Sequence, residues 1–242
     1  MSLNFTLKSW SAWSPGLDTP ADWSSWAATS ERKISDDVNP NVRDLPMMLR
    51  RRLSPLGRMA MRAAHDVKQD TMPHLVFSSR YGETSQTLKL LQSLAQNEPV
   101  SPAGFSTSVH NALAGLLSIS SKNNLPHTAI SSGKASFCAG LLEAICQLDE
   151  TPETPVLLVH YDLHLPEFYA PFGDDTVEPL ALALLLENGP SNEEEFFSFN
   201  LTKPKACNNL EDPAMNFIHY IIGAEENWSW SDETTEWSCS RL

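Results

Sequence analysis

The feature that most limits the possible folds is the alternation of short apolar runs with longer segments of helical periodicity. Apolar runs of strand length with no internal charge occupy 75–78, 156–159 and 179–187. Apolar residues spaced three or four apart, typical of amphipathic helices, occupy 58–68, 83–96 and 133–147. Buried strands that alternate with helices pack as layers, so this pattern predicts an α/β fold with a mixed sheet covered by helices.

The remaining segments extend this pattern. We expect strands at 5–13 and 125–130, and a strand at 196–201 that pairs as an edge with 179–187. The pair Asp212–Pro213 predicts the start of a helix that continues to Ile222, because aspartate caps helices and proline suits their first turn. The acidic segment 225–242, which has three tryptophans, is expected to be irregular, either a flexible end or a strap docked by its tryptophans.

A further helix is predicted over 105–120, where Ser and Thr residues precede an apolar pattern. Val109 and Leu113 are four apart and would therefore project from one face of this helix, with Ala112 beside them. His110 and Asn111 are expected to form a structural polar pair on the same segment.

The charge is unevenly distributed and argues against a nucleic-acid ligand. The net charge is −13, with 14 Lys/Arg and 10 Asp/Glu in residues 1–134 but 3 and 20 in residues 135–242. A nucleic-acid-binding protein normally carries an excess of basic residues, because it must neutralise phosphates. The exception is a group of arginines that is either a solvated surface or a landing patch for an acidic partner: Arg50, Arg51, Arg52, Arg58 and Arg62.

Cysteine spacing and hydropathy predict a cytoplasmic protein without a metal centre. The four cysteines (Cys138, Cys146, Cys207, Cys239) form no C-x-x-C pair, so we expect reduced thiols and no structural zinc site. His160 and His164 flank Asp162 and resemble a metal triad in composition only, and we expect neither a metal nor a cofactor. No apolar run reaches the length of a membrane span, and the N-terminus lacks a secretion pattern.

A set of motifs resembles the N-terminal half of the β-ketoacyl synthases. In that family a strand runs into Thr-Ala-Cys-Ser/Thr-Ser-Gly and then a helix, and here 128–133 reads Thr-Ala-Ile-Ser-Ser-Gly. The resemblance includes 101–115 upstream and 138–144 downstream, and covers about 75–187. It implies that Ile130 stands at the position of the nucleophilic cysteine. Isoleucine has no titratable atom and cannot form a thioester.

The resemblance implies a thiolase-like layered fold, of which this chain holds mainly the first half. We expect one truncated domain of 1–242, with a core at about 58–187, a mixed sheet of the five-stranded type, and a short remainder with the acidic tail at 188–242. The family's second half supplies two histidines in the motifs Glu-Ala-His-Gly-Thr and Asn-x-Gly-His, and neither occurs here. His219 lacks the glycine-rich context of those motifs.

In detail the chain resembles the short ketosynthase-like proteins of aryl polyene gene clusters, which are chain-length factors. This resemblance implies a silent subunit that pairs with a catalytic ketosynthase in polyene, polyketide or fatty-acid-like synthesis and closes the acyl tunnel. The arginine group would then receive an acyl carrier protein. The expected tunnel wall is Val109, Ala112, Leu113 and Ile130.

Two other functions are compatible with the sequence. One is a stand-alone acyltransferase or hydrolase with Ser131 or Cys138 as nucleophile, and the other is a scaffold that only stabilises a complex. We expect Ser131 and Ser132 to be N-caps of the following helix and Cys138 to be a core thiol, which argues against the first alternative.

Overall fold

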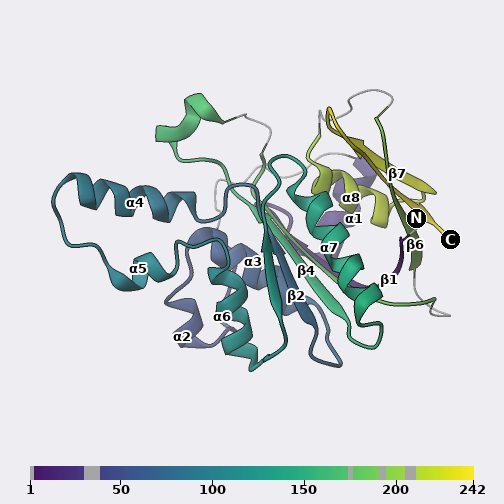
Figure 1. Cartoon of the computed structure of the whole chain (residues 1–242), viewed down its shortest axis with the longest axis horizontal. Helices are drawn as coiled ribbons and strands as arrows, with labels where there is room; N and C mark the ends of the chain where they lie inside the picture. The colour runs from purple at the N-terminus through teal and green to yellow at the C-terminus, as the bar shows by residue number, and fades with distance from the viewer. Residues whose placement is uncertain (1–2, 30–38, 174–176, 191–194, 205–210) are drawn as a thin grey trace.

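The structure is a computed structural model that describes residues 3–29, 39–173, 177–190, 195–204 and 211–242. Its strands form one mixed sheet in the order β3-β2-β4-β5-β1-β6-β8-β7, with helices on both faces (Figure 1). The strands are β1 (Leu3–Trp13), β2 (His74–Ser78), β3 (His127–Ile130), β4 (Val156–Asp162), β5 (Leu180–Glu187), β6 (Glu195–Thr202), β7 (Asn227–Ser231) and β8 (Glu236–Arg241). The α/β layered fold is confirmed, but this sheet has eight strands rather than five.

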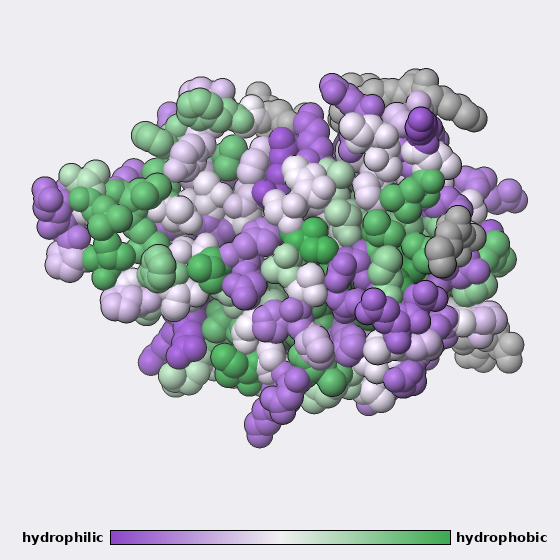
Figure 2. Space-filling model, in the orientation of Figure 1, coloured by the Kyte–Doolittle hydropathy of each residue, from purple (hydrophilic) through white to green (hydrophobic). Residues whose placement is uncertain are grey.

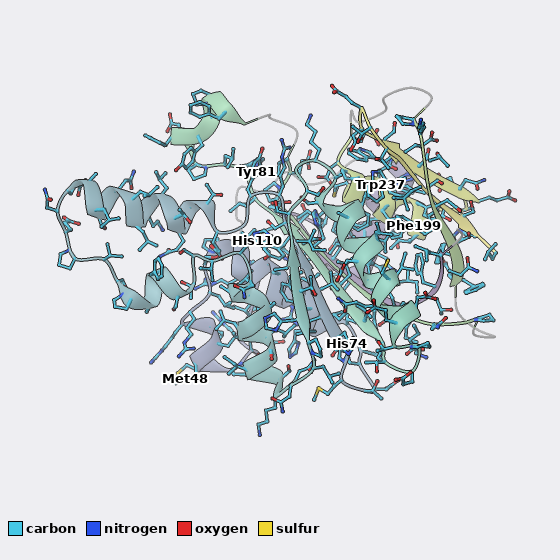
Figure 3. All side chains as sticks on the ribbon, viewed as in Figure 1. Met48, His74, Tyr81, His110, Phe199 and Trp237 are labelled. Atoms are coloured by element: carbon cyan, nitrogen blue, oxygen red, sulfur yellow. The ribbon has the colours of Figure 1, made fainter. Side chains whose placement is uncertain are left out.

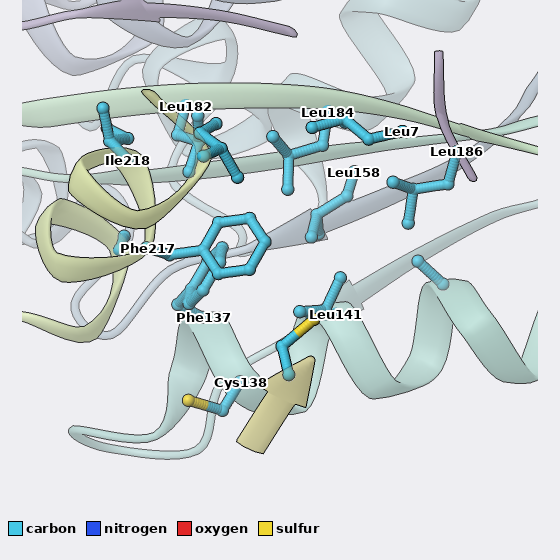
Figure 4. Packing of buried hydrophobic residues seen from close by; sticks show 14 of the residues in the cluster. Leu7, Phe137, Cys138, Leu141, Leu158, Leu182, Leu184, Leu186, Phe217 and Ile218 are labelled. Carbon is cyan, nitrogen blue, oxygen red and sulfur yellow. The ribbon is translucent and has the colours of Figure 1, made fainter. Parts of the chain in front are cut away.

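Each face of the sheet carries its own hydrophobic core. On one face lie α1 (Pro20–Thr29), α7 (Ser136–Glu150) and α8 (Pro213–Ile222), where Phe137, Leu141 and Phe217 pack on the leucines of β4 and β5 (Figure 4). On the other face lie α2 (Met47–Arg50), α3 (Pro55–Asp66) and α6 (Ala112–Ser121). Because both faces are covered, all seven residues of β4 are buried.

The helices α4 (Thr84–Ala95) and α5 (Pro102–Ser106) extend away from the sheet as an arm (Figure 1). The sequence pattern predicted α4 as an amphipathic helix, yet none of its residues is buried. Leu91, Leu94 and Phe105 are at least half exposed, and hydrophobic side chains gather over the arm in Figure 2. Beyond β4, the short 3-10 helix η1 (Glu167–Phe172) exposes Phe168 and Phe172.

The helix predicted over 105–120 is broken. It forms α5 and α6, and Val109 lies in the connection between them, so Val109 and Leu113 do not share a helical face. Hydroxyl groups account for the break, since Thr107 donates to Ala103 O and Ser108 to Phe105 O. Such side-chain bonds to nearby carbonyls compete with helix continuation.

Strand β1 takes the place that the sequence pattern assigned to β6. It pairs antiparallel with β5 on one side and with β6 on the other, so β6 contacts β1 and β8 instead of β5. The prediction of a β5–β6 edge pair was therefore wrong, because the N-terminal strand covers the free side of β5.

The C-terminal segment is regular, which corrects the prediction of an irregular tail. It forms the β7–β8 hairpin, and its three tryptophans are buried against the first core. Arg241, the second residue from the C-terminus, donates to the carbonyls of Tyr220, Ile221 and Gly223 at the end of α8 and forms an ion pair with Glu195 at 2.8 Å. Of the two alternatives for the tail, the docked strap is the observed one.

Within the described ranges, no helix combines the length and the hydropathy needed to cross a bilayer.

Candidate functional site

The parallel strands β2, β3 and β4 end at the same edge of the sheet, where motif residues from three parts of the chain meet. Parallel strands place their carboxyl ends side by side, which is where open α/β sheets hold their functional groups. Ser79, just after β2, donates its backbone N–H to Ile130 O at 3.1 Å. Asp162 ends β4 and accepts from the hydroxyl of Ser79 at 2.9 Å.

Ile130 is the last residue of β3, and the segment Ile130–Gly133 forms what we term the vestigial turn. Helix α7 begins only at Ser136, so Ile130 is not at a helix N-terminus as the motif predicted. Gly133 has φ of 57°, a left-handed conformation that favours glycine. The Ser136 hydroxyl accepts from Ser132 N and donates to Gly133 O, which braces the turn from within α7.

The two serines of the vestigial turn are not N-caps, which corrects that prediction. The cap position of α7 is Ala135, without a side-chain hydrogen bond. Ser131 is exposed and donates its hydroxyl to Arg80 O at 3.2 Å. Cys138 is fully buried, and burial raises the pKa of its thiol well above the ordinary value, so it is a core thiol. Among the described residues, no hydrogen bond joins either side chain to a base that would make it a nucleophile.

His110 contacts the vestigial turn. Its Nε2 donates to Ile130 O at 2.9 Å, and its ring lies against Gly82, near Tyr81 in Figure 3. Gly82 has φ of 55°, and a Cβ there would lie 2.8 Å from the His110 ring. The predicted pairing of His110 with Asn111 is replaced by this contact, and Asn111 instead stands at the N-cap position of α6.

A buried polar network lies behind the turn. His160 Nδ1 is 3.0 Å from the Ser78 hydroxyl, and its Nε2 is 3.7 Å from Asp162 Oδ2. Burial lowers the pKa of His160 to about 3. Burial also raises the pKa of Asp162 to about 7, against the opposing effect of hydrogen bonds from Arg80 N, Tyr81 N and Ser79. The network pins the loop that follows β2 to the end of β4.

The histidine–aspartate composition around Asp162 does not form a metal site. His160 and Asp162 are buried in this network, whereas His164 is exposed. In the portion of the chain that the structure describes, no three His, Cys, Asp or Glu side chains gather as metal ligands.

A wide groove, the α6 groove, runs between α5, α6 and the segment before α3. Its volume is about 720 Å³, and it is open to solvent along one side. Three of the four residues expected in a tunnel wall line it, namely Val109, Ala112 and Leu113. Ile130 does not line it and instead packs against the first core.

The arginine group divides into three environments. Arg51 and Arg52 line the α6 groove. Arg50 and Arg58 line a separate open basin of about 520 Å³, together with Arg43. Arg62 is largely buried and forms ion pairs with Asp44 and Asp66, so it holds the preceding loop on α3 and is not part of a free patch.

The basin has the character of an anion site. The Nε atoms of Arg50 and Arg58 are buried and reach no hydrogen-bond acceptor within the described residues. Among the described residues, Arg58 donates to the Asn39 side chain, at 3.4 Å. Buried N–H groups without an acceptor are costly, and the three guanidinium groups concentrate positive charge around the basin.

Sequence patterns missed two residues of the groove, Ser54 and Glu83. Glu83 is buried and accepts a hydrogen bond from the Ser54 hydroxyl at 2.6 Å. Ser54 directly precedes Pro55 and caps α3, a position that the Ser-Pro pair indicates. No pattern in the sequence marks Glu83, since it merely precedes α4.

The comparisons with known proteins agree on one family. The family model for the N-terminal domain of β-ketoacyl synthase matches residues 23–240. A chain of the complex between the ketosynthase ApeO and its chain length factor ApeC, from Xenorhabdus doucetiae, is 31% identical. The match covers 99% of this chain and 100% of that chain, with a TM-score of 0.85.

Two more distant structures share the fold. The ishigamide ketosynthase/chain length factor is 16% identical, with a TM-score of 0.66, over 83% of this chain and 67% of that chain. A complex of the acyl carrier protein AntF with its ketosynthase AntDE is 10% identical, with a TM-score of 0.71, over 100% of both chains. No curated protein matches the chain. The predicted thiolase-like fold is confirmed, and the chain belongs to the β-ketoacyl synthase family.

Proposed function

We propose that this chain is a non-catalytic chain-length factor that pairs with a ketosynthase in aryl polyene or related polyketide synthesis. The observation that carries the proposal is a groove, open on one side, near a strand end that holds isoleucine in place of a nucleophile. Val109 and Asn111 line this groove and flank His110, which bonds Ile130 O. The partner would supply the cysteine and both histidines and cover the groove, which would then become the far part of the acyl tunnel. Three described cysteines are free thiols, which supports a cytoplasmic location.

Two surface features support pairing. Strand β3 pairs only with β2 among the described strands, so its other edge offers unpaired backbone groups. Val109 and Ile119 line the α6 groove, and Ile119 is 72% exposed. Exposed apolar groups that gather around one groove are typical of a protein interface.

The pairing is tested with Ile119→Glu, matched to Phe172→Glu on η1, which is 84% exposed and outside the groove. A buried interfacial carboxylate is costly, so we expect Ile119→Glu to weaken the 1:1 complex with the ketosynthase about tenfold or more. Phe172→Glu should leave it unchanged. Sedimentation of the co-expressed proteins measures both.

A wild-type chain that stays monomeric beside its ketosynthase would overturn the pairing. The stand-alone alternative makes the opposite prediction, namely acyl transfer by the isolated chain that is lost on Ser131→Ala.

We further propose that the arginine basin receives acidic groups of an acyl carrier protein. The support is its three arginines, two of which have a buried N–H group without an acceptor among the described residues, and the acidic composition of residues 135–242, which repel an acidic partner elsewhere.

Reversing the charge at Arg50 and Arg58 to glutamate should weaken carrier association with the complex about tenfold at low salt and less at high salt, because salt screens exposed charges. The matched control is Lys68→Glu with Lys122→Glu, two exposed lysines outside the basin that change the net charge equally. If both double variants lose the same carrier affinity, the effect comes from net charge alone, and the basin is not part of the docking surface.

A further inference from the structure

Next to the α6 groove lies a second, smaller space, which we term the α4 cavity. It has a volume of about 340 Å³ and lies between the start of α3, the inner side of α4 and the loop after β4. This volume is within the range of about 300–1,000 Å³ that small-molecule sites occupy. Most of its wall is apolar: Leu56, Leu88, Leu163, Leu165 and Pro166.

The groove and the cavity share one wall, which consists of Ser54 and Glu83. These two residues line both spaces. The Ser54 hydroxyl accepts from Gly57 N at 2.9 Å and donates to Glu83 Oε1 at 2.6 Å, so the first turn of α3 holds the carboxyl in place. Leu53, also in the groove lining, and Leu113 pack against Gly57 and support the wall from behind.

Glu83 is an unusual wall residue because it is buried without a bonded cation. It is 8% exposed, and among the described residues its side chain accepts a hydrogen bond only from Ser54. Burial raises its pKa, and Lys89 at the cavity opposes this by its charge alone. A single side-chain hydrogen bond therefore holds this carboxyl in place between the groove and the mainly apolar cavity.

We propose that the Ser54–Glu83 pair is a length-determining stop at the inner end of the acyl tunnel, and that the α4 cavity is a latent site for the apolar end of a longer acyl chain. The inference rests on the proposed function, since it takes the covered groove as the tunnel. The conjugated hydrocarbon part of a polyene chain has no groups to pair with the carboxyl. Its tip would have to desolvate or displace the Ser54–Glu83 bond in order to pass, which is unfavourable.

The test removes the wall and then refills the cavity. Glu83→Ala should open the groove into the cavity and lengthen the product of the reconstituted pair by one or more extender units. Glu83→Gln keeps the size of the side chain and an acceptor for Ser54, so it should keep the original length. Adding Leu88→Trp to Glu83→Ala fills the cavity and should restore the original length. Mass spectrometry of products from intact complexes measures all three.

The outcomes separate this inference from the proposed function. Unchanged length in an intact Glu83→Ala complex, while Ala112→Phe still shortens the product, would overturn the stop and leave the groove as the tunnel. Unchanged length in both variants would overturn the tunnel itself. If Glu83→Gln also lengthens the product, the charge of Glu83 sets the product length, and the proposed stop is overturned. Should Glu83→Ala fail to assemble, Glu83→Thr opens the same wall with a smaller polar side chain and decides between these outcomes.

Discussion

Replacing Asp162 with asparagine is expected to make the free energy of unfolding fall by about 1.4 kcal/mol for each pH unit below 6.5. In the wild type the paired groups offset each other. Between pH 4 and 6.5 the unfolded chain binds one proton on His160, whose pKa is lowered from 6.5 to about 3 in the fold. The folded chain binds one proton on Asp162, whose pKa is raised from 3.8 to about 7. The proton counts are equal, so this pair contributes no slope.

Asparagine removes the compensating proton from the folded state. His160 then contributes stability that is present above pH 6.5 and is lost as the pH falls toward 3. His160→Asn should give the opposite slope, because the raised pKa of Asp162 alone stabilises below pH 3.8 and is lost as the pH rises through 7. Denaturant unfolding of the wild type and both variants from pH 4.5 to 7.5 gives the slope of the free energy of unfolding against pH. A pH-independent loss of stability in a variant does not change this slope. Equal slopes in the wild type and both variants would show that His160 and Asp162 do not have the shifted pKa values that the burial of this network requires.

The second large effect is expected from Ala112→Phe, which should shorten the product of the complex. Ala112 is the first residue of α6, is half-buried and lines the α6 groove, so a phenyl ring there would enter the groove instead of the core. A chain forced past it meets overpacking of about 1–3 kcal/mol. That cost corresponds to about a 5- to 150-fold slower extension past this point.

The matched control is Ser121→Phe, the same side chain at an exposed position on the same helix but outside the groove. Products should keep their length in that variant, and both complexes should remain intact by sedimentation. Leu113→Ala is a poorer probe because Leu113 is 3% exposed and packs against Gly57. Its loss should cost about 2–5 kcal/mol of stability and would mix a folding defect with a tunnel effect. Equal lengths from Ala112→Phe and wild type would favour the scaffold function.

Local patterns predicted the parts of the fold that local interactions determine. Asp212 caps α8 by accepting from Ala214 N and Met215 N, as the Asp-Pro pair indicated. The apolar runs of β4 and β5 were recognisable because both faces of these strands are buried. The position of β1 was not predictable in this way, since its pairing of Thr6 with Glu187 joins distant parts of the chain.

The candidate site was predicted in its residues better than in its geometry. The motif located Ile130 and the turn after it, and the groove brought Val109, Ala112 and Leu113 together. The break before α6 depends on hydroxyl hydrogen bonds of Thr107 and Ser108, which apolar periodicity does not register. The roles of Arg62 and Glu83 depend on partners from other segments. Composition therefore could not show that Arg62 forms a partly buried ion pair or that Glu83 is part of a wall, rather than lying on a free surface.

The central position of β1 has a consequence for the synthesis of this chain. The ribosome makes β1 long before its two neighbours, β5 and β6, which end at Glu187 and Thr202. Until those strands emerge, an apolar strand has both backbone edges unpaired, which favours aggregation and recruits chaperones. Arg241 fastens α8 only after β8 has been made. The sheet is therefore completed late, and substitutions in β8 act on the closing step of the whole sheet.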